Sequence, residues 1–384
     1  MDGGGALSLT IVDALARIDK ASWDGLANPQ GEPFDPFLSW DFLQALEESG
    51  CVDGRSGWTP AHVVARDAQG ALAGAMPLYA KDHSYGEYVF DHSWADAMRR
   101  AGGQYYPKLQ CAVPFTPVPG RRLLARDPQV ASALAQGAVA LAQRAEASSV
   151  HVTFASEAQC EALRPLGYLT RTGLQYHWFN NGYARFEDFT AALSSGKRKN
   201  VRRERAKAQE IAIVKRLRGA DIKARDWDFF FRCYMDTGSR KWGSPYLNRE
   251  FFEALGQRMA DRIVLFVAEH EGRPIASALN LLGDEALYGR YWGRIDDVPF
   301  LHFELCYYQA IELAIELGLP RVEAGAQGEH KLARGYMPVP TYSAHWIAHR
   351  GLRNAVATYL RAETPAVVEE AEILAEHAPF KKGD

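Results

Sequence analysis

The sequence predicts an α/β fold, and two observations lead to this prediction. Segments with strand periodicity alternate along the chain with segments of helical periodicity, an order typical of α/β proteins rather than all-β or all-helical ones. The order hairpin, helix and strand occurs twice, so that Val63 corresponds to Val264 and Val150 to Val322. Because 384 residues exceed what one core usually holds, we expect two domains that arose by duplication.

The first half of the chain contains one copy of this order. Its predicted elements are a helix at 36–48, strands at 61–66 and 71–79 around a turn at 69–70, a helix at 129–145 and a strand at 149–154. Between the hairpin and the second helix lies a region rich in Gly, Tyr and Pro, at 84–120.

The second half repeats the pattern with changed loop lengths. Its predicted elements are strands at 262–269, 274–282 and 286–292, a helix at 301–317, a strand at 321–324 and a closing helix at 352–376. We place the domain boundary near 180–185, which gives an N-terminal domain at 1–180 and a C-terminal domain at 181–384.

Composition excludes several classes of protein. The formal net charge is −3, from 44 basic and 47 acidic residues, so the chain as a whole is not an electrostatic nucleic-acid binder. No apolar run of about 18 residues suits a membrane span, and the N-terminus has no basic leader. Five widely spaced cysteines without a CxxC pair fit reduced thiols, so we expect a soluble, cytoplasmic protein whose oligomeric state stays open.

The strongest local departure from this composition is the segment 196–207. It contains seven basic residues and one acid, a local charge of about +6. Because only Val201 is strongly apolar, we expect this helix to bury no face, with Ser194 or Ser195 as its cap. It is either a solvated basic helix or a phosphate clamp. The clamp residues would be Lys197, Arg198, Arg202 and Arg203.

A second group of charged residues follows the strand at 321–324, in a loop bounded by glycines. Acid, base and cations occupy six positions there: Glu329, His330, Lys331 and Arg334. An acyl transfer needs a base for the amine proton and a donor for the oxyanion, so Glu329 and His330 are candidate catalytic groups and the two cations are candidate substrate contacts. The alternative is a polar loop with internal ion pairs.

Glu304 lies on the apolar side of the helix at 301–317. A carboxyl group in this position either has a raised pKa and acts as a base or pairs with a buried cation. Tyr291, on the preceding strand, is a candidate for the wall of the same cavity.

The Gly- and Tyr-rich region of the first half suggests a pocket wall, with Tyr85 and Lys108 as substrate contacts, or else structural packing. We predict no metal site, since strand periodicity at 342–348 would separate His345 from His349 by about 13 Å. The motifs GxSxG, HExxH, GxGxxG and GxxxxGK[ST] are absent.

Taken together, these segments resemble the Fem-like branch of the GNAT acyltransferase superfamily, whose members are described as peptidoglycan biosynthesis or recognition proteins. The segments that carry the resemblance are 36–39, 42–47, 83–94, 105–110, 113–117, 197–205, 238–243, 288–293 and 325–335. The resemblance implies two tandem GNAT-like domains, with mixed, mainly antiparallel sheets flanked by helices. It also implies transfer of an acyl or aminoacyl group to an amine.

For the donor, the resemblance offers aminoacyl-tRNA, as in Fem-type enzymes that act on a peptidoglycan precursor, or acyl-CoA, as in ordinary GNAT enzymes. The glycines of the GNAT pyrophosphate loop are missing at 294–302. We expect an N-acyltransferase with Glu304, Glu329 or His330 near the reacting amine, a phosphate-bearing substrate and no tightly bound cofactor. The competing hypotheses are a binding module for a muropeptide, nucleotide-sugar or RNA, and an acyl-CoA-dependent transferase with a polyamine-like acceptor.

Overall fold

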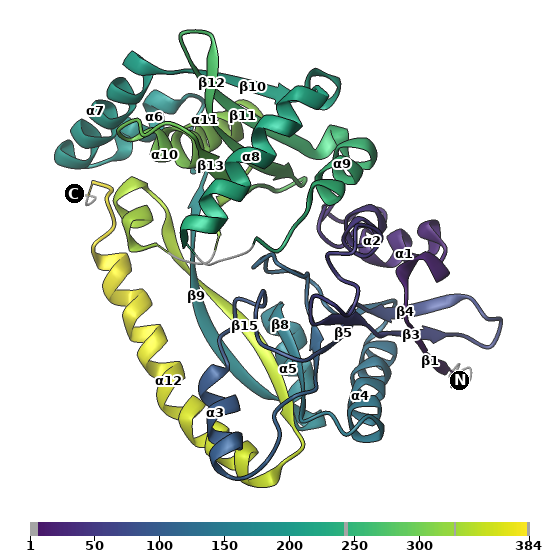
Figure 1. The fold of residues 1–384 in the computed structure, drawn as a ribbon. Helices are drawn as coiled ribbons and strands as arrows, with labels where there is room; N and C mark the ends of the chain where they lie inside the picture. The colour runs from purple at the N-terminus through teal and green to yellow at the C-terminus, as the bar shows by residue number, and fades with distance from the viewer. Residues whose placement is uncertain (1–6, 242–244, 326–327, 382–384) are drawn as a thin grey trace. The chain divides into compact units, whose positions relative to one another are not determined.

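The structure is a computed structural model that describes residues 7–241, 245–325 and 328–381 (Figure 1). The chain divides into two compact units: unit 1 is Met1–Gly173 with Pro340–Glu369, and unit 2 is Leu174–Val339 with Glu370–Asp384. These units differ from the contiguous division at residue 180. The chain re-enters unit 1 within the strand β15 (Met337–Ile347) and leaves it within the long helix α12 (Arg350–Glu376).

Unit 1 contains two groups of paired strands. The first is an antiparallel sheet in the order β1 (Ser8–Val12), β3 (His62–Arg66), β4 (Leu72–Met76) and β7 (Leu124–Ala125). The second runs from β15 through β8 (Ser149–Ala155), β6 (Lys108–Cys111) and β5 (Leu78–Lys81) to β2 (Trp58–Pro60). Only the pair β6 and β8 of the second group is parallel.

The helices of unit 1 are mostly short. They are η1 (Leu15–Arg17), α1 (Lys20–Ala27), α2 (Trp40–Glu48), α3 (His92–Arg100), α4 (Pro128–Arg144), α5 (Glu157–Leu163), η2 (Arg164–Leu166) and the first part of α12. The Ala-rich α4 contacts β3, β4 and β8 (Figure 1) and buries Leu134, Ala135 and Ala138 against them.

Unit 1 differs from its predicted elements at two places, beside Pro36 and at Pro77. The helix predicted from Pro36 begins only at Trp40, because the Ser39 hydroxyl caps it by accepting a hydrogen bond from the Phe42 N–H. The strand predicted over 71–79 is two strands, β4 and β5, in different groups. Pro77 lies between them and cannot donate to a ladder.

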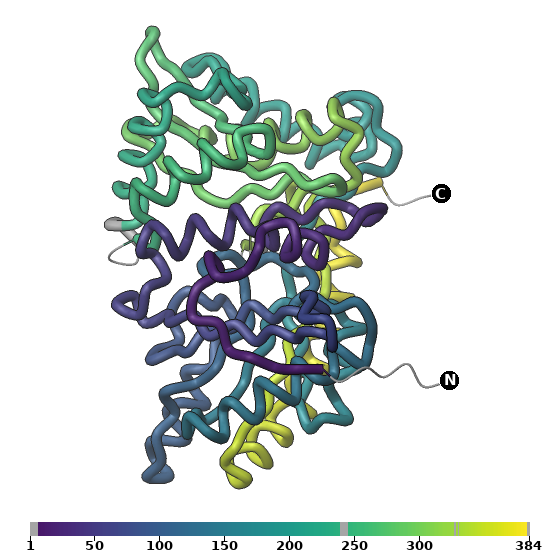
Figure 2. The backbone as a smooth tube through the Cα atoms, turned by 90° about the vertical axis from the view of Figure 1, so that its right-hand side faces the viewer, coloured from purple at the N-terminus to yellow at the C-terminus, as the bar shows by residue number. Residues whose placement is uncertain are grey.

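Unit 2 contains one strand group of mixed direction. Its order is β10 (Ile213–Arg218), β11 (Ile263–His270), β12 (Arg273–Leu282), β13 (Ala286–Arg294), β14 (Arg321–Glu323) and β9 (Leu169–Phe179), the last of which begins in unit 1. Only β13 and β14 pair in parallel. The turn at Glu271 and Gly272 joins β11 to β12 and projects from the end of this group in Figure 2.

Helices flank these strands. They are α6 (Phe186–Ala192), α7 (Ser195–Ile211), η3 (Gly219–Asp221), α8 (Ala224–Lys241), α9 (Arg249–Arg258), η4 (Ala260–Arg262), α10 (Leu301–Phe303), α11 (Gln309–Glu316) and η6 (Glu329–Arg334). Between α10 and α11, residues Glu304–Tyr308 form a π-helix, η5, which interrupts the single helix predicted at 301–317. Short π-helical segments are frequent at functional sites.

The basic segment corrects one expectation. It forms α7 as predicted, but it does bury a face, because Val201, Glu204 and Ala208 follow one another at helical spacing and point inward. Ser194 is the N-cap residue, although its side chain makes no capping hydrogen bond. The helix is therefore amphipathic, with a charged residue at the centre of its buried face.

The predicted fold class is confirmed: the chain is an α/β protein with mixed, mainly antiparallel strands and flanking helices. Over the described ranges, no helix is both long and apolar enough to cross a membrane.

The Gly293→Ala variant tests how tightly β13 packs against α8. A Cβ at residue 293 would lie 1.9 Å from the carbonyl oxygen of Cys233 in α8, a distance that requires the backbone to move. We expect the free energy of unfolding to fall by about 3 kcal/mol, as for overpacked cores. Chemical denaturation followed by circular dichroism measures the change. Gly196→Ala is the control, because its Cβ meets nothing within 4 Å, and equal losses in both variants would contradict the packing argument.

Candidate functional site

A cavity in unit 2 lies where two parallel strands separate. β13 and β14 pair over only three positions, from Ala286 with Arg321 to Tyr288 with Glu323. β14 ends there, whereas β13 continues to Arg294. Crevices beyond the carboxyl ends of neighbouring strands are the usual ligand sites of open α/β sheets. The cavity at this separation has a volume of about 100 Å³.

Four parts of unit 2 supply the walls of this cavity. Its lining residues are Ala278, Leu279 and Asn280 of β12, Gly289, Arg290, Tyr291 and Trp292 of β13, His302, Cys306 and Tyr307 of α10 and η5, and Ala324 after β14. Tyr291 is thus placed as predicted, on the wall of a cavity that it shares with the helix at 301–317. Its ring packs edge-to-face on Tyr234 and Phe252, which fixes this wall.

A β-bulge shapes the cavity wall. Leu279 pairs with Tyr291 and Asn280 pairs with Gly289, so Arg290 is the residue that the bulge inserts into β13. A Cβ at residue 289 would lie 3.3 Å from the Asn280 Oδ1 atom, which explains the glycine beside the bulge. A bulge turns side chains and backbone groups out of the strand ladder, and this bulge does so next to the cavity.

Buried charges surround the bulge. The Arg290 Nη2 atom lies 3.8 Å from Oε2 of Glu323, and His177 Nε2 lies 3.9 Å from the same oxygen. Lys331 is buried, and its ammonium donates to the carbonyl oxygens of Ala324 at 2.7 Å and Gly325 at 3.0 Å. Burial, with Arg290 nearby, lowers the Lys331 pKa to about 8. Lys331 therefore holds the loop after β14, which differs from the substrate contact predicted for it.

His330 reaches the cavity through a tyrosine. The Tyr307 hydroxyl and His330 Nε2 lie 2.8 Å apart, and Tyr307 lines the cavity while His330 is exposed. Burial raises the pKa of Tyr307, so the phenol keeps its proton at neutral pH. The pair connects the cavity to solvent by one hydrogen bond. The side chain of Glu329, the other catalytic candidate in this loop, lies outside the described residues.

Glu304 is fully buried, as its position on the apolar helix face predicted. Its Oε1 atom accepts hydrogen bonds from Gln309 Nε2 at 2.7 Å, Gln209 Nε2 at 3.0 Å and Arg205 Nε at 3.3 Å. Of the two roles considered for this carboxylate, the geometry matches pairing with a buried cation. Glu304 is also absent from the residues that line the cavity.

The outer face of α7 carries the predicted clamp residues. Arg202 and Arg203 are exposed, and Lys197 and Arg198 are half-buried. Within the described ranges, no ion pair joins any of these four side chains to a carboxylate. The structure therefore leaves a positively charged surface on this helix, as the unbalanced composition suggested.

The inner face of α7 holds a different charge pair. Arg334 donates to Glu204 from Nη2 at 2.9 Å and from Nε at 3.1 Å, and the Tyr308 hydroxyl donates to the same carboxylate. Arg334 Nη1 also donates to the carbonyl oxygen of His330 at 2.7 Å. Arg334 thus ties η6 to α7, which differs from the substrate contact predicted for it.

In unit 1, Lys108 differs from the predicted phosphate contact. Its side chain is fully buried, and its ammonium donates to Asp91 at 2.5 Å, to Glu87 at 2.7 Å and to the Ser84 hydroxyl at 2.8 Å. Burial alone would lower the Lys108 pKa, but the two carboxylates outweigh it and hold the pKa above its usual value. This cation stabilises the interior of unit 1.

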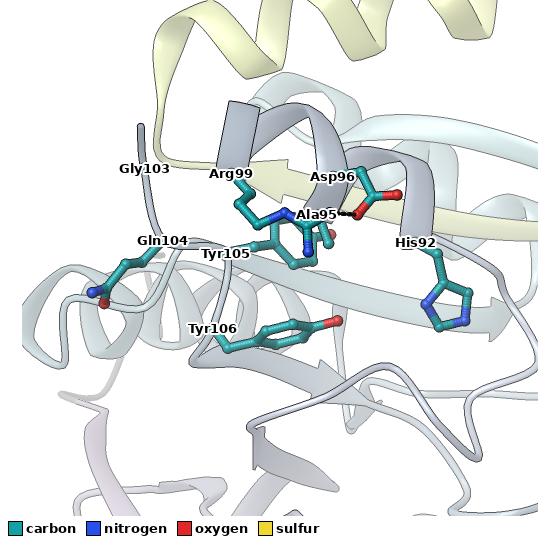
Figure 3. A pocket seen from close by; sticks show the side chains of 8 residues that line it. All are labelled: His92, Ala95, Asp96, Arg99, Gly103, Gln104, Tyr105 and Tyr106. Carbon is teal, nitrogen blue, oxygen red and sulfur yellow. Dashed lines mark hydrogen bonds and ion pairs between the residues drawn. The ribbon is translucent and has the colours of Figure 1, made fainter. Parts of the chain in front are cut away.

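A second cavity, of about 440 Å³, lies beside this cluster between α3 and the segment 103–106 (Figure 3). Figure 3 shows the Tyr106 ring below α3, and its hydroxyl lies 2.8 Å from Ser84 Oγ, which also contacts Lys108. His92 lines the cavity, and Tyr85, which is 59% exposed, packs on the His92 ring. The polar aromatic region of the first half thus does border a pocket.

The strand pattern predicted the position of one of the two histidines considered for a metal and failed for the other. His345 lies in β15 and its Nδ1 atom contacts His151 Nδ1 at 2.7 Å, whereas His349 follows the end of that strand. The His349 Nδ1 atom accepts from the Leu352 N–H at the start of α12. In the described ranges, no group of three metal-ligating side chains is found.

Three residues of the unit 2 site were not among the predicted site residues. Asn280 interrupts the apolar run of β12, a signal that a buried polar side chain has a specific role. Glu204 is the single acid in the basic segment, which made it distinctive in composition but did not indicate that it faces inward. Tyr307 gave no distinctive signal, because the π-helix that places it on the cavity wall is not visible in the sequence pattern.

Comparisons with known proteins agree with this fold. The family model FemAB-like, described as peptidoglycan biosynthesis/recognition, matches residues 14–382, so the chain belongs to the FemAB-like family. No curated protein sequence matches the chain.

Three solved structures share the fold at low sequence identity. FemX is 11% identical with a TM-score of 0.55, covering 88% of this chain and 98% of its own. L-PGS from Bacillus licheniformis is 11% identical with a TM-score of 0.51, covering 92% and 99%. A conserved protein of unknown function from Bacteroides thetaiotaomicron is 11% identical with a TM-score of 0.53, covering 88% and 99%. At this identity the likeness shows the fold alone.

The buried Lys81 gives unit 1 a testable pH dependence. Burial lowers its pKa to about 7, from 10.5. Between these values the unfolded chain binds one more proton than the folded chain, so this lysine makes stability rise with pH. We expect the stability of the native protein relative to Lys81→Met to rise between pH 7.5 and 10, by roughly 1.4 kcal/mol per pH unit at most.

Urea denaturation at several pH values measures this difference. Lys20→Met is the control, because Lys20 is half exposed in its ion pair with Asp41. The burial argument fails if the free energies of unfolding of Lys81→Met and of the native protein change equally with pH over this range.

Proposed function

We propose that this protein is an N-acyltransferase that moves an acyl or aminoacyl group from an activated donor to an amine in the unit 2 cavity. The observation that carries the proposal is the cavity at the separation of β13 and β14. One of its walls is a bulge at Arg290, and another carries the Tyr307–His330 pair. A buried cation beside a proton-transfer path is the combination that acyl transfer to an amine requires.

Arg290 and the bulge supply the electrostatic part of the reaction. The amine nitrogen attacks the carbonyl carbon of the donor, a C–N bond forms, and negative charge develops on the carbonyl oxygen. A buried guanidinium and the redirected backbone N–H groups of a bulge stabilise such an oxyanion strongly, because water is excluded there. The bond to the donor's leaving group then breaks as the carbonyl reforms.

Tyr307 and His330 supply the proton path. The attacking amine releases a proton, which the Tyr307 hydroxyl accepts as it passes its own proton to His330 Nε2. Because His330 is exposed, the imidazole returns to its neutral form by exchange with solvent. The leaving group, a thiolate or a ribose alkoxide, takes up a proton from water. In this proposal Glu304 has a structural role rather than the role of base.

The exposed cations of α7 favour a phosphate-bearing donor, such as acyl-CoA or aminoacyl-tRNA. Family membership supports a peptidoglycan-precursor-like acceptor. The unit 1 cavity is bordered by the aromatic rings of His92 and Tyr106, which suit a ring-containing ligand.

The alternative function is a binding module that holds a muropeptide, nucleotide-sugar or RNA without turnover. The observation in its favour is the unit 1 cavity, which at about 440 Å³ is larger than the cavity of unit 2. A mass-spectrometric assay separates the two functions. The protein is incubated with acetyl-CoA, longer acyl-CoAs or charged tRNA, each with a panel of amines and muropeptides. An acylated amine supports the transferase, and saturable binding without product supports the module.

Substitution of Arg290 tests the oxyanion role. We expect Arg290→Met to lower kcat about 10²-fold with little change in KM for the amine, as for loss of one oxyanion donor. Arg273→Met is the control, because Arg273 forms a surface ion pair with Asp296 at the start of β12. Transferase turnover that survives unchanged in Arg290→Met would remove Arg290 from the mechanism.

Neutralising the outer face of α7 tests donor binding. We expect Arg202→Ala with Arg203→Ala to raise KM for a phosphate-bearing donor about tenfold at low salt and to leave kcat unchanged, because these side chains bind phosphate away from the reacting carbonyl. The effect should shrink as salt rises. Lys215→Ala, which removes an exposed cation already paired with Glu269 at 2.7 Å, is the matched control. Equal KM values in all three proteins would contradict the clamp.

A further inference from the structure

The two faces of α7 have different surroundings. Arg202 and Arg203 point outward, whereas Glu204 and Arg205, the next two residues, face the interior of unit 2. Glu204 is 8% exposed and accepts hydrogen bonds from both Arg334 and Tyr308. Anion binding on the outer face and the buried carboxylate therefore act on one rigid helix.

A continuous series of hydrogen bonds leads from Glu204 to the cavity. Arg334 bonds the Glu204 carboxylate with two nitrogens and the carbonyl oxygen of His330 with the third, at 2.7 Å. The His330 ring contacts the Tyr307 hydroxyl at 2.8 Å, and Tyr307 lines the cavity. Arg334 also lies over the Phe303 ring at 3.4 Å, which restricts the guanidinium to one position.

The π-helix is held from α7 at both of its ends. Glu304, its first residue, accepts from Arg205 and Gln209 of α7. Tyr308, its last residue, donates to Glu204. A π-helix is less stable than an α-helix and needs such side-chain contacts to persist. The position of α7 therefore determines how the residues between Glu304 and Tyr308 are oriented toward the cavity.

We infer that Glu204 is a positioning residue that couples the phosphate-binding face of α7 to the Tyr307–His330 pair in the cavity. The inference rests on the proposed function and adds a role for a residue that touches neither donor nor acceptor. A phosphate group on Arg202 and Arg203 fixes α7, and through Glu204 and Arg334 it fixes the imidazole that takes the proton. Donor binding and the proton path are thereby linked through contacts within unit 2.

Hydrogen–deuterium exchange of the full chain, with and without inorganic pyrophosphate, tests the coupling without needing turnover. In the native protein we expect pyrophosphate to slow exchange in α7 and also in 303–308 and 329–336, by about fivefold or more. The double variant Arg202→Ala and Arg203→Ala should lose protection in all three segments. This control assigns the pyrophosphate site to the outer face of α7.

Variants of Glu204, Arg334 and Tyr308 test the inferred coupling directly. Glu204→Gln and Arg334→Lys should keep protection of α7 and lose it in 303–308 and 329–336. Arg334→Lys keeps the positive charge opposite Glu204, so it serves where Glu204→Gln fails to fold. Tyr308→Phe leaves both Arg334 bonds in place and should keep most of the remote protection. Protection of the remote segments that persists in both Glu204→Gln and Arg334→Lys overturns the coupling.

The remaining outcomes separate this inference from the proposed function. If pyrophosphate protects no segment of the native protein, the phosphate clamp and the coupling both fail. If the coupling appears but no acylated product forms with any donor, Glu204 still links the two sites and the transferase is wrong. Where turnover is present, Glu204→Gln should lower kcat more than it raises KM for the donor, and Tyr308→Phe should lower kcat much less than Glu204→Gln does.

Discussion

The separation of β13 from β14 is the constraint on which the unit 2 site depends. A parallel pair of strands inside a mainly antiparallel group requires a crossover, which here consists of α10, the π-helix and α11. Because the pairing ends at Tyr288 and Glu323, the crossover rather than another strand covers the far end of β13. The cavity is therefore walled by backbone with redirected polar groups on one side and by aromatic side chains of the crossover on the other.

Burial of charge determines most of the remaining geometry of unit 2. A carboxylate or guanidinium without a partner would cost several kcal/mol in the interior, so each buried charge fixes the position of its partner. Glu204 fixes Arg334, and Glu304 fixes Arg205. Both pairs join α7 to the crossover or to η6. A helix that buries few apolar side chains, Val201 and Ala208, is thus attached by ion pairs as well as by hydrophobic packing, which explains how so basic a segment folds against the unit.

The fold was largely predictable because it follows from local patterns. The hairpin of the second half, the Ala-rich α4 and the strand β8 lie within a residue or two of their predicted bounds. Prediction failed where a single residue has a non-local effect: Pro77 divides a predicted strand between two groups, and the π-helix interrupts a predicted helix. At the site, composition identified the basic segment, but periodicity could not show that Glu204 turns inward to meet a residue 130 positions later in the chain.

The buried cations of the two units have different surroundings. In unit 1, Lys108 has carboxylate oxygens at 2.5 Å and 2.7 Å, so its charge is neutralised inside the protein. In unit 2, Arg290 lines the cavity, and its Nη2 atom lies 3.8 Å from Oε2 of Glu323. Coulomb energy rises as the dielectric falls, so a guanidinium on the wall of a water-poor cavity interacts strongly with a ligand bound beside it. In the proposed function, the unit 2 cavity is therefore the one in which developing negative charge is stabilised.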